Sequence, residues 1–490
     1  MNKRNFIHYG AYLVIAIITS LIYYKISQRI NINSDMASGF LAAIDVSKGN
    51  IFLKGWSLST VPFYFTEIVW YSLVILVGGY HYMYNYALPA IYLVILCILI
   101  IVSCDNKKTG FFLTFFLLGS PGLFLASNIL VPVIHIGAYI FSLISLLLSI
   151  KYIKDGSRNH LIANYFLLTM VFFSDSISLF IILFPFLVVC FVNFLRGETH
   201  KRWSTLTIMS LFSYASSLMI WTLFKKYGFN VPGYPSPTFV SLDTFYSNLN
   251  ILVEGFLRLQ DAFFFGTDPH NRHTIFICLS FLCLFYITVM LFLKLKKLKE
   301  FDNIDFYLCS ATFVMPMAFV VSSVNVGVSS IRYIIPFFIF IIIFISRKND
   351  AITSKTRLNS LVFSVMFITS VYSIYDMLNT PKAVNKMHSV SDIIKKNGLK
   401  KGYAEFWHAS SISVYDDVQV APVYYDGTKL IKMKWLSKDE WYDAGSNFVI
   451  INNIDIEATV VKQFGNPDKV IEAEGVKIFT WSKNLIALDN

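Results

Sequence analysis

The sequence LPAIYLVILCILIIVS, residues 88–103, contains no charged side chain and is followed closely by Lys107 and Lys108. An apolar run of this length predicts a helix that crosses a lipid bilayer, because the hydrocarbon core needs about 20 residues of helix. Positive charge in the loop after such a run indicates the cytoplasmic side of the membrane. Apolar runs that alternate with short basic clusters recur along most of the chain, so this pattern decides the fold class.

The composition indicates the same class. Hydrophobic residues make up 56% of the 490 residues and charged residues only 14%, whereas a typical soluble domain has about 45–50% and about 25%. The net charge of +11 would also suit a nucleic-acid-binding protein. That class needs a contiguous basic face with interleaved aromatic residues, however, and here the basic residues lie in short clusters. We therefore expect membrane lipid, and no nucleic acid, as a partner.

We predict a multispan α-helical membrane protein with about eleven transmembrane helices. The first helix follows Lys3 and Arg4, which places the N-terminus in the cytosol and, after eleven spans, the C-terminus outside. The predicted spans cover residues 7–24, 88–103, 111–130, 133–152, 160–174, 177–195, 204–224, 274–294, 304–322, 332–346 and 359–376.

The segment Val61 to Val77 is also apolar, and it decides the parity of this topology. Counted as a span, it would place the basic loops outside the cytosol, against the positive-inside rule. Counted as a helix in the outer interface, it leaves every strong basic cluster inside. The segment contains Pro62, Glu67 and Trp70, which suits an interfacial helix. We favour the interfacial helix, and the spanning alternative stays open.

Two outer loops are long, residues 25–87 and 225–273. In the second loop, apolar residues between Leu249 and Leu257 recur at helical spacing and predict an amphipathic helix. We divide the chain into a membrane domain, residues 1–377, which includes both loops, and a soluble domain, residues 378–490, outside the membrane.

The predicted soluble domain begins where charged residues return and short runs of alternating apolar residues appear. Turn signals such as Asp426-Gly427 separate these runs, and Val390 to Asn397 has the pattern of a capped helix. We therefore expect a small α/β domain, with extended runs at Gly402 to Trp407, Ser411 to Tyr415, Val418 to Tyr425, Phe448 to Ile451 and Val476 to Trp481.

Two acidic residues of the first outer loop are candidate catalytic residues. Asp35 lies in NINSDMASG, residues 31–39, directly after the first helix. Its carboxylate could take a proton from an acceptor hydroxyl, or it could instead be the N-cap of a surface helix. Glu67 interrupts an aromatic segment, and a carboxylate at a membrane is a functional candidate by default. The alternative is that Glu67 lies on the exposed polar face of an interfacial helix.

Arg332 is the strongest candidate cation, in SSIRYIIP, residues 329–336, at the outer mouth of a span. A guanidinium binds phosphate through bidentate hydrogen bonds, although an arginine that marks a helix end is the alternative. Tyr333 is either its partner or an aromatic belt residue. His135 lies at another outer helix start, where a lone histidine is more often a satisfied polar residue than a catalytic one.

The remaining polar motifs predict no metal centre and no cofactor. Asp268, His270 and His273 lie in TDPHNRH, residues 267–273, but their spacing matches no standard metal motif. The chain has no glycine-rich phosphate loop, so a soluble nucleotide-dependent mechanism is not supported.

Together these features resemble the GT-C superfamily, whose members are membrane glycosyltransferases that take a sugar from a polyprenyl-phosphate carrier. The segments NSD (33–35), GWSLST (55–60) and FYFTE (63–67) look like the first-loop signature of bacterial members. Arg332 with Tyr333 looks like their late-helix motif. The most similar subgroup is the serotype-converting O-antigen glucosyltransferases of enteric bacteria.

The resemblance implies an inverting hexosyltransferase of the bacterial inner membrane, with its C-terminal domain in the periplasm. It would move a sugar, glucose as the best guess, from undecaprenyl phosphate to a polysaccharide acceptor such as lipopolysaccharide O-antigen. The donor is then a substrate and no cofactor is implied, while a divalent metal is left open.

The resemblance also assigns roles to residues of this sequence. In the wider superfamily a second acidic residue often adjoins the first, whereas here Met36 follows Asp35, so Glu67 would take that place. By the resemblance, Asp35 would be the general base with Glu67 as a second catalytic carboxylate, and Arg332 and Tyr333 would bind the donor phosphate. His135 is a possible substrate-binding residue, and Trp407 suits stacking on a sugar, although core packing is the more common role of such a tryptophan.

Two other functions stay open. A transporter or flippase for lipid-linked saccharides would need ionisable residues inside spans and broken helices in related halves. An O-antigen polymerase or ligase also works at the outer face, but such proteins usually lack a C-terminal soluble domain of this size.

Overall fold

The computed structural model describes residues 3–233, 237–347, 357–415, 418–452, 454–486 and 488. The chain forms two compact units, each assembled from three segments. The helical unit comprises Met1–Ile30, Pro89–Leu218 and Pro235–Lys382. The mixed unit comprises Asn31–Leu88, Met219–Tyr234 and Ala383–Asn490.

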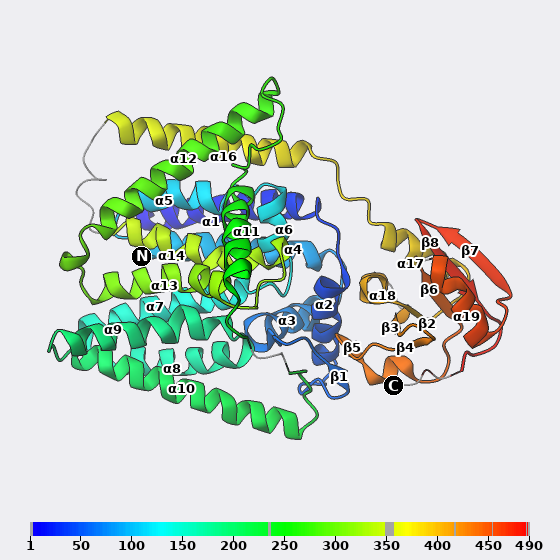
Figure 1. The fold of residues 1–490 in the computed structure, drawn as a ribbon. Helices are drawn as coiled ribbons and strands as arrows, with labels where there is room; N and C mark the ends of the chain where they lie inside the picture. The colour runs from blue at the N-terminus through cyan, green and yellow to red at the C-terminus, as the bar shows by residue number, and fades with distance from the viewer. Residues whose placement is uncertain are drawn as a thin grey trace. The chain divides into compact units, whose positions relative to one another are not determined.

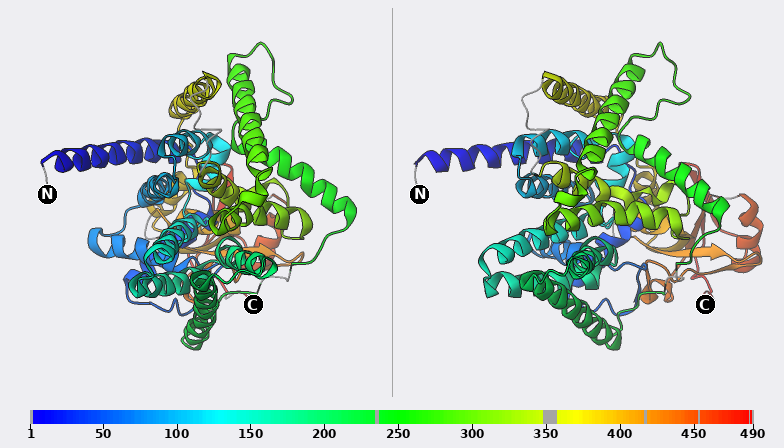
Figure 2. Two further views of the ribbon diagram at one scale, coloured as in Figure 1. Left: turned by 90° about the vertical axis from the view of Figure 1, so that its left-hand side faces the viewer. Right: turned by 60° about the vertical axis from the view of Figure 1, so that its left-hand side comes forward.

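The described secondary-structure elements of the helical unit are all helices. Two of them, α4 and α10, continue into the mixed unit. Within it α7 packs beside α8, α12 beside α16, and α13 against both α9 and α14 (Figures 1 and 2). Its elements are α1 (Lys3–Ser27), α4 (Tyr84–Ser103), α5 (Lys107–Leu117), α6 (Leu123–Ile129), α7 (Ile136–Asp155), α8 (Arg158–Ser174), η2 (Leu179–Leu183), α9 (Phe184–Leu195), α10 (Lys201–Lys226), α11 (Leu242–Leu259), α12 (Arg272–Leu295), η3 (Leu298–Glu300), α13 (Asn303–Val321), η4 (Val328–Ile334), α14 (Ile335–Ile345) and α16 (Arg357–Asn379).

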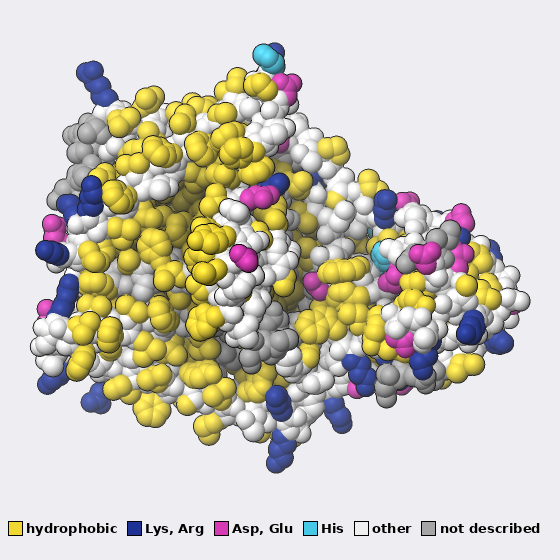
Figure 3. All heavy atoms as spheres, in the orientation of Figure 1, with side chains coloured by type: hydrophobic (Ala, Val, Ile, Leu, Met, Phe, Trp, Pro, Cys, Tyr) yellow, Lys and Arg dark blue, Asp and Glu magenta, His cyan; other side chains and the backbone are white. Residues whose placement is uncertain are grey.

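The chain is a helical membrane protein. Among the described residues, seven helices are long and apolar enough to cross a bilayer: α4, α7, α10, α12, α13, η4 with α14, and α16. Shorter apolar helices cover Tyr12–Ser27, Tyr64–Gly78 and Leu179–Leu195. Hydrophobic side chains cover much of the face of the helices seen in Figure 3, and large apolar patches of this kind mark contact with lipid or protein. The number of eleven spans stays a prediction.

One predicted span is wrong as a continuous helix. Residues 111–130 form two helices, because α5 ends at Leu117 and α6 begins at Leu123. The intervening residues include Pro121, which has no backbone N–H to donate and disfavours the helical conformation of the residue before it. A Cβ at Gly122 would lie 1.9 Å from Oδ2 of Asp261, so close packing at this break requires glycine. The amphipathic helix predicted in the second outer loop is present as α11.

The mixed unit combines a six-stranded sheet with helices from both ends of the chain. The strand order is β4-β3-β2-β6-β8-β7, and β2 is parallel to both β3 and β6, whereas the outer pairs are antiparallel. The elements are α2 (Ser34–Ser47), β1 (Trp56–Ser57), η1 (Tyr64–Ile68), α3 (Val69–Gly78), α17 (Lys386–Lys396), β2 (Lys401–Glu405), α18 (Phe406–Ser413), β3 (Gln419–Tyr425), β4 (Leu430–Lys432), β5 (Ser437–Lys438), η5 (Asp439–Tyr442), β6 (Phe448–Ile451), η6 (Ile454–Ile456), α19 (Glu457–Phe464), β7 (Lys469–Ala473) and β8 (Val476–Thr480).

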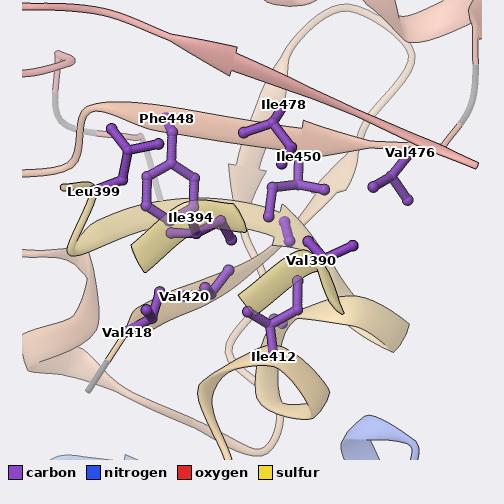
Figure 4. Packing of buried hydrophobic residues seen from close by; sticks show 12 residues of the cluster. Val390, Ile394, Leu399, Ile412, Val418, Val420, Phe448, Ile450, Val476 and Ile478 are labelled. Atoms are coloured by element: carbon purple, nitrogen blue, oxygen red, sulfur yellow. The ribbon is translucent and has the colours of Figure 1, made fainter. Parts of the chain in front are cut away.

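The core of this sheet lies under helices α17 and α18. Val390 of α17 and Ile412 of α18 meet Val420, Ile450 and other buried side chains of the central strands (Figure 4). The predicted α/β character of the C-terminal part is therefore confirmed. The expected strand Ser411 to Tyr415 is wrong, because its first three residues end helix α18. There the packing of a buried helix overrides the alternating apolar pattern.

The first outer loop packs with the C-terminal segment. Strand β1 pairs with β5, so that Trp56 lies opposite Lys438, and the Tyr80 hydroxyl donates a hydrogen bond of 2.6 Å to the Val414 carbonyl. The division of the sequence at residue 377 did not anticipate this association. That residue 377 ends the membrane domain and residue 378 begins a soluble domain stays a prediction.

Candidate active site

The six candidate residues fall into two groups of three. Asp35, Glu67 and Trp407 belong to the mixed unit, and His135, Arg332 and Tyr333 belong to the helical unit.

Asp35 lies in the first turn of α2 but does not cap it. The N-cap is Asn33, whose Oδ1 accepts a hydrogen bond of 3.0 Å from the backbone N–H of Met36. The alternative of Asp35 as an N-cap is therefore wrong. Asp35 is half-buried in this first turn, where the helix dipole favours a carboxylate.

Helix α2, which carries Asp35, is packed on two sides. Phe40 stacks on Tyr71 of α3, with ring centroids 4.7 Å apart and planes 6° from parallel. Helix α18 makes the second contact, in which the Ser34 hydroxyl oxygen accepts a hydrogen bond of 3.4 Å from the backbone N–H of Ser411. Because a rigid support keeps a reacting group in place, this packing suits a functional role for the first turn.

Glu67 is completely buried, with 0% of its surface exposed. It lies in the π-helical turn η1, and the Tyr71 hydroxyl donates a hydrogen bond of 2.8 Å to its Oε2. The alternative of an exposed polar face is therefore wrong. Through Tyr71, Glu67 is linked to Phe40 on the helix that carries Asp35. π-Helical turns occur frequently at functional sites.

A hollow of about 570 Å³ opens in the same unit beside Asp45. The Asp45 carboxylate accepts hydrogen bonds from the Trp56 indole at 2.8 Å and from the Asn50 amide at 2.6 Å, and it pairs with Lys438 at 3.0 Å. Tyr80, Trp441 and Gln419 also line the hollow, and Asp45 therefore has a structural role in its wall. Aromatic rings beside hydrogen-bonding groups form surfaces with an apolar body and a polar rim.

Trp407 is 58% exposed on α18 and contacts Phe406 edge to face, with centroids 5.0 Å apart. Core packing is the ordinary role of tryptophan, and Trp441 has that role against Trp56. It is not the role of Trp407, whose ring is open for a ligand to stack on.

The structure brings the three candidates of the helical unit together. The Arg332 guanidinium lies 5.3 Å from the centre of the Tyr333 ring, and the Tyr333 and His135 rings are 5.4 Å apart. The Tyr139 hydroxyl donates to the Arg332 carbonyl at 3.5 Å. Residues from η4 and the start of α7 therefore form one polar cluster.

The cluster contains a fourth side chain, Asp175, which the sequence reasoning missed. His135 Nδ1 lies 2.7 Å from Asp175 Oδ2, and both side chains are buried. The other oxygen, Oδ1, accepts from the Ile177 N–H at 3.1 Å. Asp175 lies between two predicted spans. Ionisable residues in apolar surroundings are functional candidates. This rule selected Glu67, and it applies equally to Asp175.

The backbone before α7 is strained at two residues. Val133 has φ +52° and His135 has φ +76°, and this left-handed conformation costs a non-glycine residue about 1–2 kcal/mol. Strain of this kind persists only where the surrounding structure holds it, and it gathers at functional sites. His135, one of the two strained residues, is also the residue whose ring contacts Asp175.

Arg332 retains a donor for a further partner. Its Nε is buried and makes no hydrogen bond to any residue that the structure describes. Leaving a buried donor unpaired costs about 1–3 kcal/mol, and an anion such as phosphate would remove that cost. An arginine that only marks a helix end would keep its donors in water, so the burial of Nε argues against that alternative.

Asp268, His270 and His273 are engaged locally. Asp268 Oδ1 accepts from the His270 backbone N–H at 2.9 Å, and His273 Nδ1 lies 3.2 Å from the Tyr372 hydroxyl. Within the described ranges, no three His, Cys, Asp or Glu residues gather as potential metal ligands. No protein-family model and no curated protein matches the chain.

Proposed function

We propose that this protein is an inverting membrane glycosyltransferase that moves a sugar, glucose as the best guess, from undecaprenyl phosphate to a cell-surface polysaccharide. The acceptor would be a polymer such as lipopolysaccharide O-antigen, on the periplasmic side of the bacterial inner membrane. The observation that carries the proposal is the cluster of half-buried Arg332 and Tyr333 with buried His135 and Asp175.

This cluster suits the phosphate of a lipid-linked donor. Arg332 would bind the phosphate and stabilise the charge that grows on it as the sugar leaves, where electrostatic help has its largest effect. Asp175 would accept a hydrogen bond from His135 Nδ1. This bond would hold the proton on Nδ1 and leave Nε2 as the ring nitrogen that can contact substrate. His135 and Tyr333 would complete the polar wall around the phosphate.

Asp35 would be the general base. It takes the proton of an acceptor hydroxyl while that oxygen bonds to the anomeric carbon. The bond between this carbon and the phosphate oxygen breaks, and undecaprenyl phosphate leaves with the electron pair. Because attack and departure occur on opposite faces, the configuration inverts. Glu67 is too buried to contact substrate and would position α2 through Tyr71.

Trp407 and the hollow beside Asp45 are the candidate sites for the acceptor. Sugar rings stack on exposed aromatic faces, and their hydroxyls bond to polar groups at the edge. The exposed ring of Trp407 offers such a face. Tyr80, Gln419 and Lys438 supply hydrogen-bonding groups around the hollow.

The test is the structure of lipopolysaccharide, by mass spectrometry, from cells that express the wild type, Asp35→Asn or Arg332→Ala at matched membrane levels. The proposal expects one added hexose per repeat unit with the wild type and none with either variant. An increment that persists with Asp35→Asn would remove Asp35 as the base. A change in chain length without added hexose would indicate a polymerase or ligase.

A transporter of lipid-linked saccharides is the second candidate, because α5 and α6 form a broken helix and transporter sites are built on broken helices. Purified protein in liposomes separates the two functions. A transferase releases undecaprenyl phosphate from its glucose-linked form when acceptor polysaccharide is present. A transporter moves that lipid across the bilayer and leaves its glycosidic bond intact.

A further inference from the structure

The break between α5 and α6 adjoins a small cavity of the helical unit. Its volume is about 10 Å³, which is room for one water-sized sphere. Residues at the ends of α5 and α11 line it together with hydroxyl side chains of α16. None of these residues belongs to the Arg332 cluster.

The lining has more hydrogen-bond acceptors than donors. The Ser373 hydroxyl lies 3.1 Å from Asp261 Oδ2 and 3.1 Å from the Ser120 carbonyl, but a hydroxyl has one proton to donate. The Ser120 hydroxyl donates to the Phe115 carbonyl at 2.9 Å, and the Thr369 hydroxyl donates within its own helix. The protons of these three hydroxyls are therefore committed to protein acceptors, although Ser280 and Gln260 also line the cavity.

Ser370 adds a further oxygen. It is 1% exposed, and its Oγ has no hydrogen-bond partner in the described part of the chain. Ser370 lines the same cavity as Asp261. A buried hydroxyl without a partner is costly unless a ligand fills the space in front of it.

The local charge is negative as well. Helices α5 and α11 both end at this cavity, and the C-terminal end of a helix carries a partial negative charge. Asp261 supplies a carboxylate above its pKa, which burial raises to about 6 and which Asp376 also acts to raise. Oxygen ligands, one carboxylate and two helix C-termini together favour a cation.

We propose that the cavity binds one monovalent cation of sodium size, with the Asp261 carboxylate, the Ser120 carbonyl and the Ser370 and Ser373 hydroxyls as ligands. Hard cations take oxygen ligands, and a single carboxylate balances a single positive charge. The cation would hold α16 and the end of α11 against the broken helix. This inference does not depend on the proposed glycosyl transfer.

The experiment measures the melting temperature of the full-length protein in detergent at pH 8, in NaCl and in choline chloride of equal ionic strength. A ligand that binds only the folded state raises stability with its concentration. We expect a saturable rise with sodium for the wild type. The rise should be absent for Asp261→Asn and smaller for Ser370→Ala.

Asp376→Asn is the matched control, because it removes a carboxylate that affects Asp261 without lining the cavity. It should keep the sodium response. Equal melting in both salts for the wild type, or an unchanged sodium response in Asp261→Asn, would overturn the proposal. If Asp261→Asn does not fold, binding of radioactive sodium to the wild type decides: one saturable site per chain, weakened in Ser370→Ala, supports the proposal, and no binding overturns it.

Discussion

Half-buried Arg332 differs from Arg347, a buried arginine of the helical unit. Both terminal nitrogens of Arg347 bond to the Asp302 carboxylate, at 2.7 and 2.8 Å, so its charge serves the structure. Arg332 instead lies over the Tyr333 ring with a buried donor that bonds to no described residue. At the scale of single residues, this contrast is the reason that Arg332, and not Arg347, is proposed to bind the donor phosphate.

We predict that Arg332→Lys lowers the rate of sugar transfer roughly 100-fold, because lysine keeps the charge but loses the bidentate geometry that a phosphate matches. The initial rate with a glucose-linked undecaprenyl phosphate donor measures this. Arg258→Lys is the control, since Arg258 pairs with Glu254 at the surface. A rate for Arg332→Lys within twofold of the wild type would contradict a phosphate-binding role.

Asp175 is expected to act by positioning His135. Replacing it with asparagine keeps the size of the side chain but removes the charge that orients the imidazole. We predict that Asp175→Asn raises KM for the lipid-linked donor about tenfold, with little change in melting temperature. The control is Asp155→Asn, which alters an exposed pair with His160. A matched loss of activity and of folded protein would instead mean a structural role.

The pH dependence of stability should report Asp261. Its pKa in the folded protein is raised from 3.8 to about 6, so the folded state binds the proton more tightly than the unfolded state. The stabilisation is present below about pH 4 and is lost as the pH rises through about 6, by at most about 3 kcal/mol. In sodium-free buffer, the melting temperature of the wild type should fall over this range relative to Asp261→Asn. Parallel curves for the two proteins would refute the assignment.

At the scale of elements, the helix break after Leu117 depends on Gly122. A Cβ there would collide with the Asp261 carboxylate, and forcing extra atoms into a packed site costs about 1–3 kcal/mol. We therefore predict that Gly122→Ala lowers the melting temperature by several degrees. Gly233→Ala is the control, because a Cβ at Gly233 meets no atom within 4 Å. Equal melting of the two variants would show that the break tolerates a side chain.

At the scale of the whole molecule, the mixed unit joins segments far apart in the sequence. Lys438 reaches back to Asp45, 393 residues earlier, at 3.0 Å, and β5 pairs with β1 beside it. We predict that Lys438→Ala speeds hydrogen exchange in residues 50–57, because it leaves Asp45 with one partner fewer. Lys434→Ala is the control, since Lys434 lies at the surface, 3.8 Å from Asp439. Unchanged exchange in both variants would mean that strand pairing alone holds the loop.

The membrane class, the long apolar helices and the α/β character of the C-terminal part could all be predicted from the amino-acid sequence. These features depend on composition and local periodicity, which neighbouring residues carry. For the same reason Arg332, Tyr333 and His135 could be selected one at a time as polar residues at the ends of apolar runs.

Which of these residues contact one another could not be predicted from the sequence and follows from the fold. The contact of His135 with Asp175 and Tyr333, the burial of Glu67 and the exposure of Trp407 depend on how separate elements pack. The same holds for the helical conformation of Ser411 and for the cavity beside Asp261. Local sequence does not encode these features, because each depends on side chains contributed by distant segments.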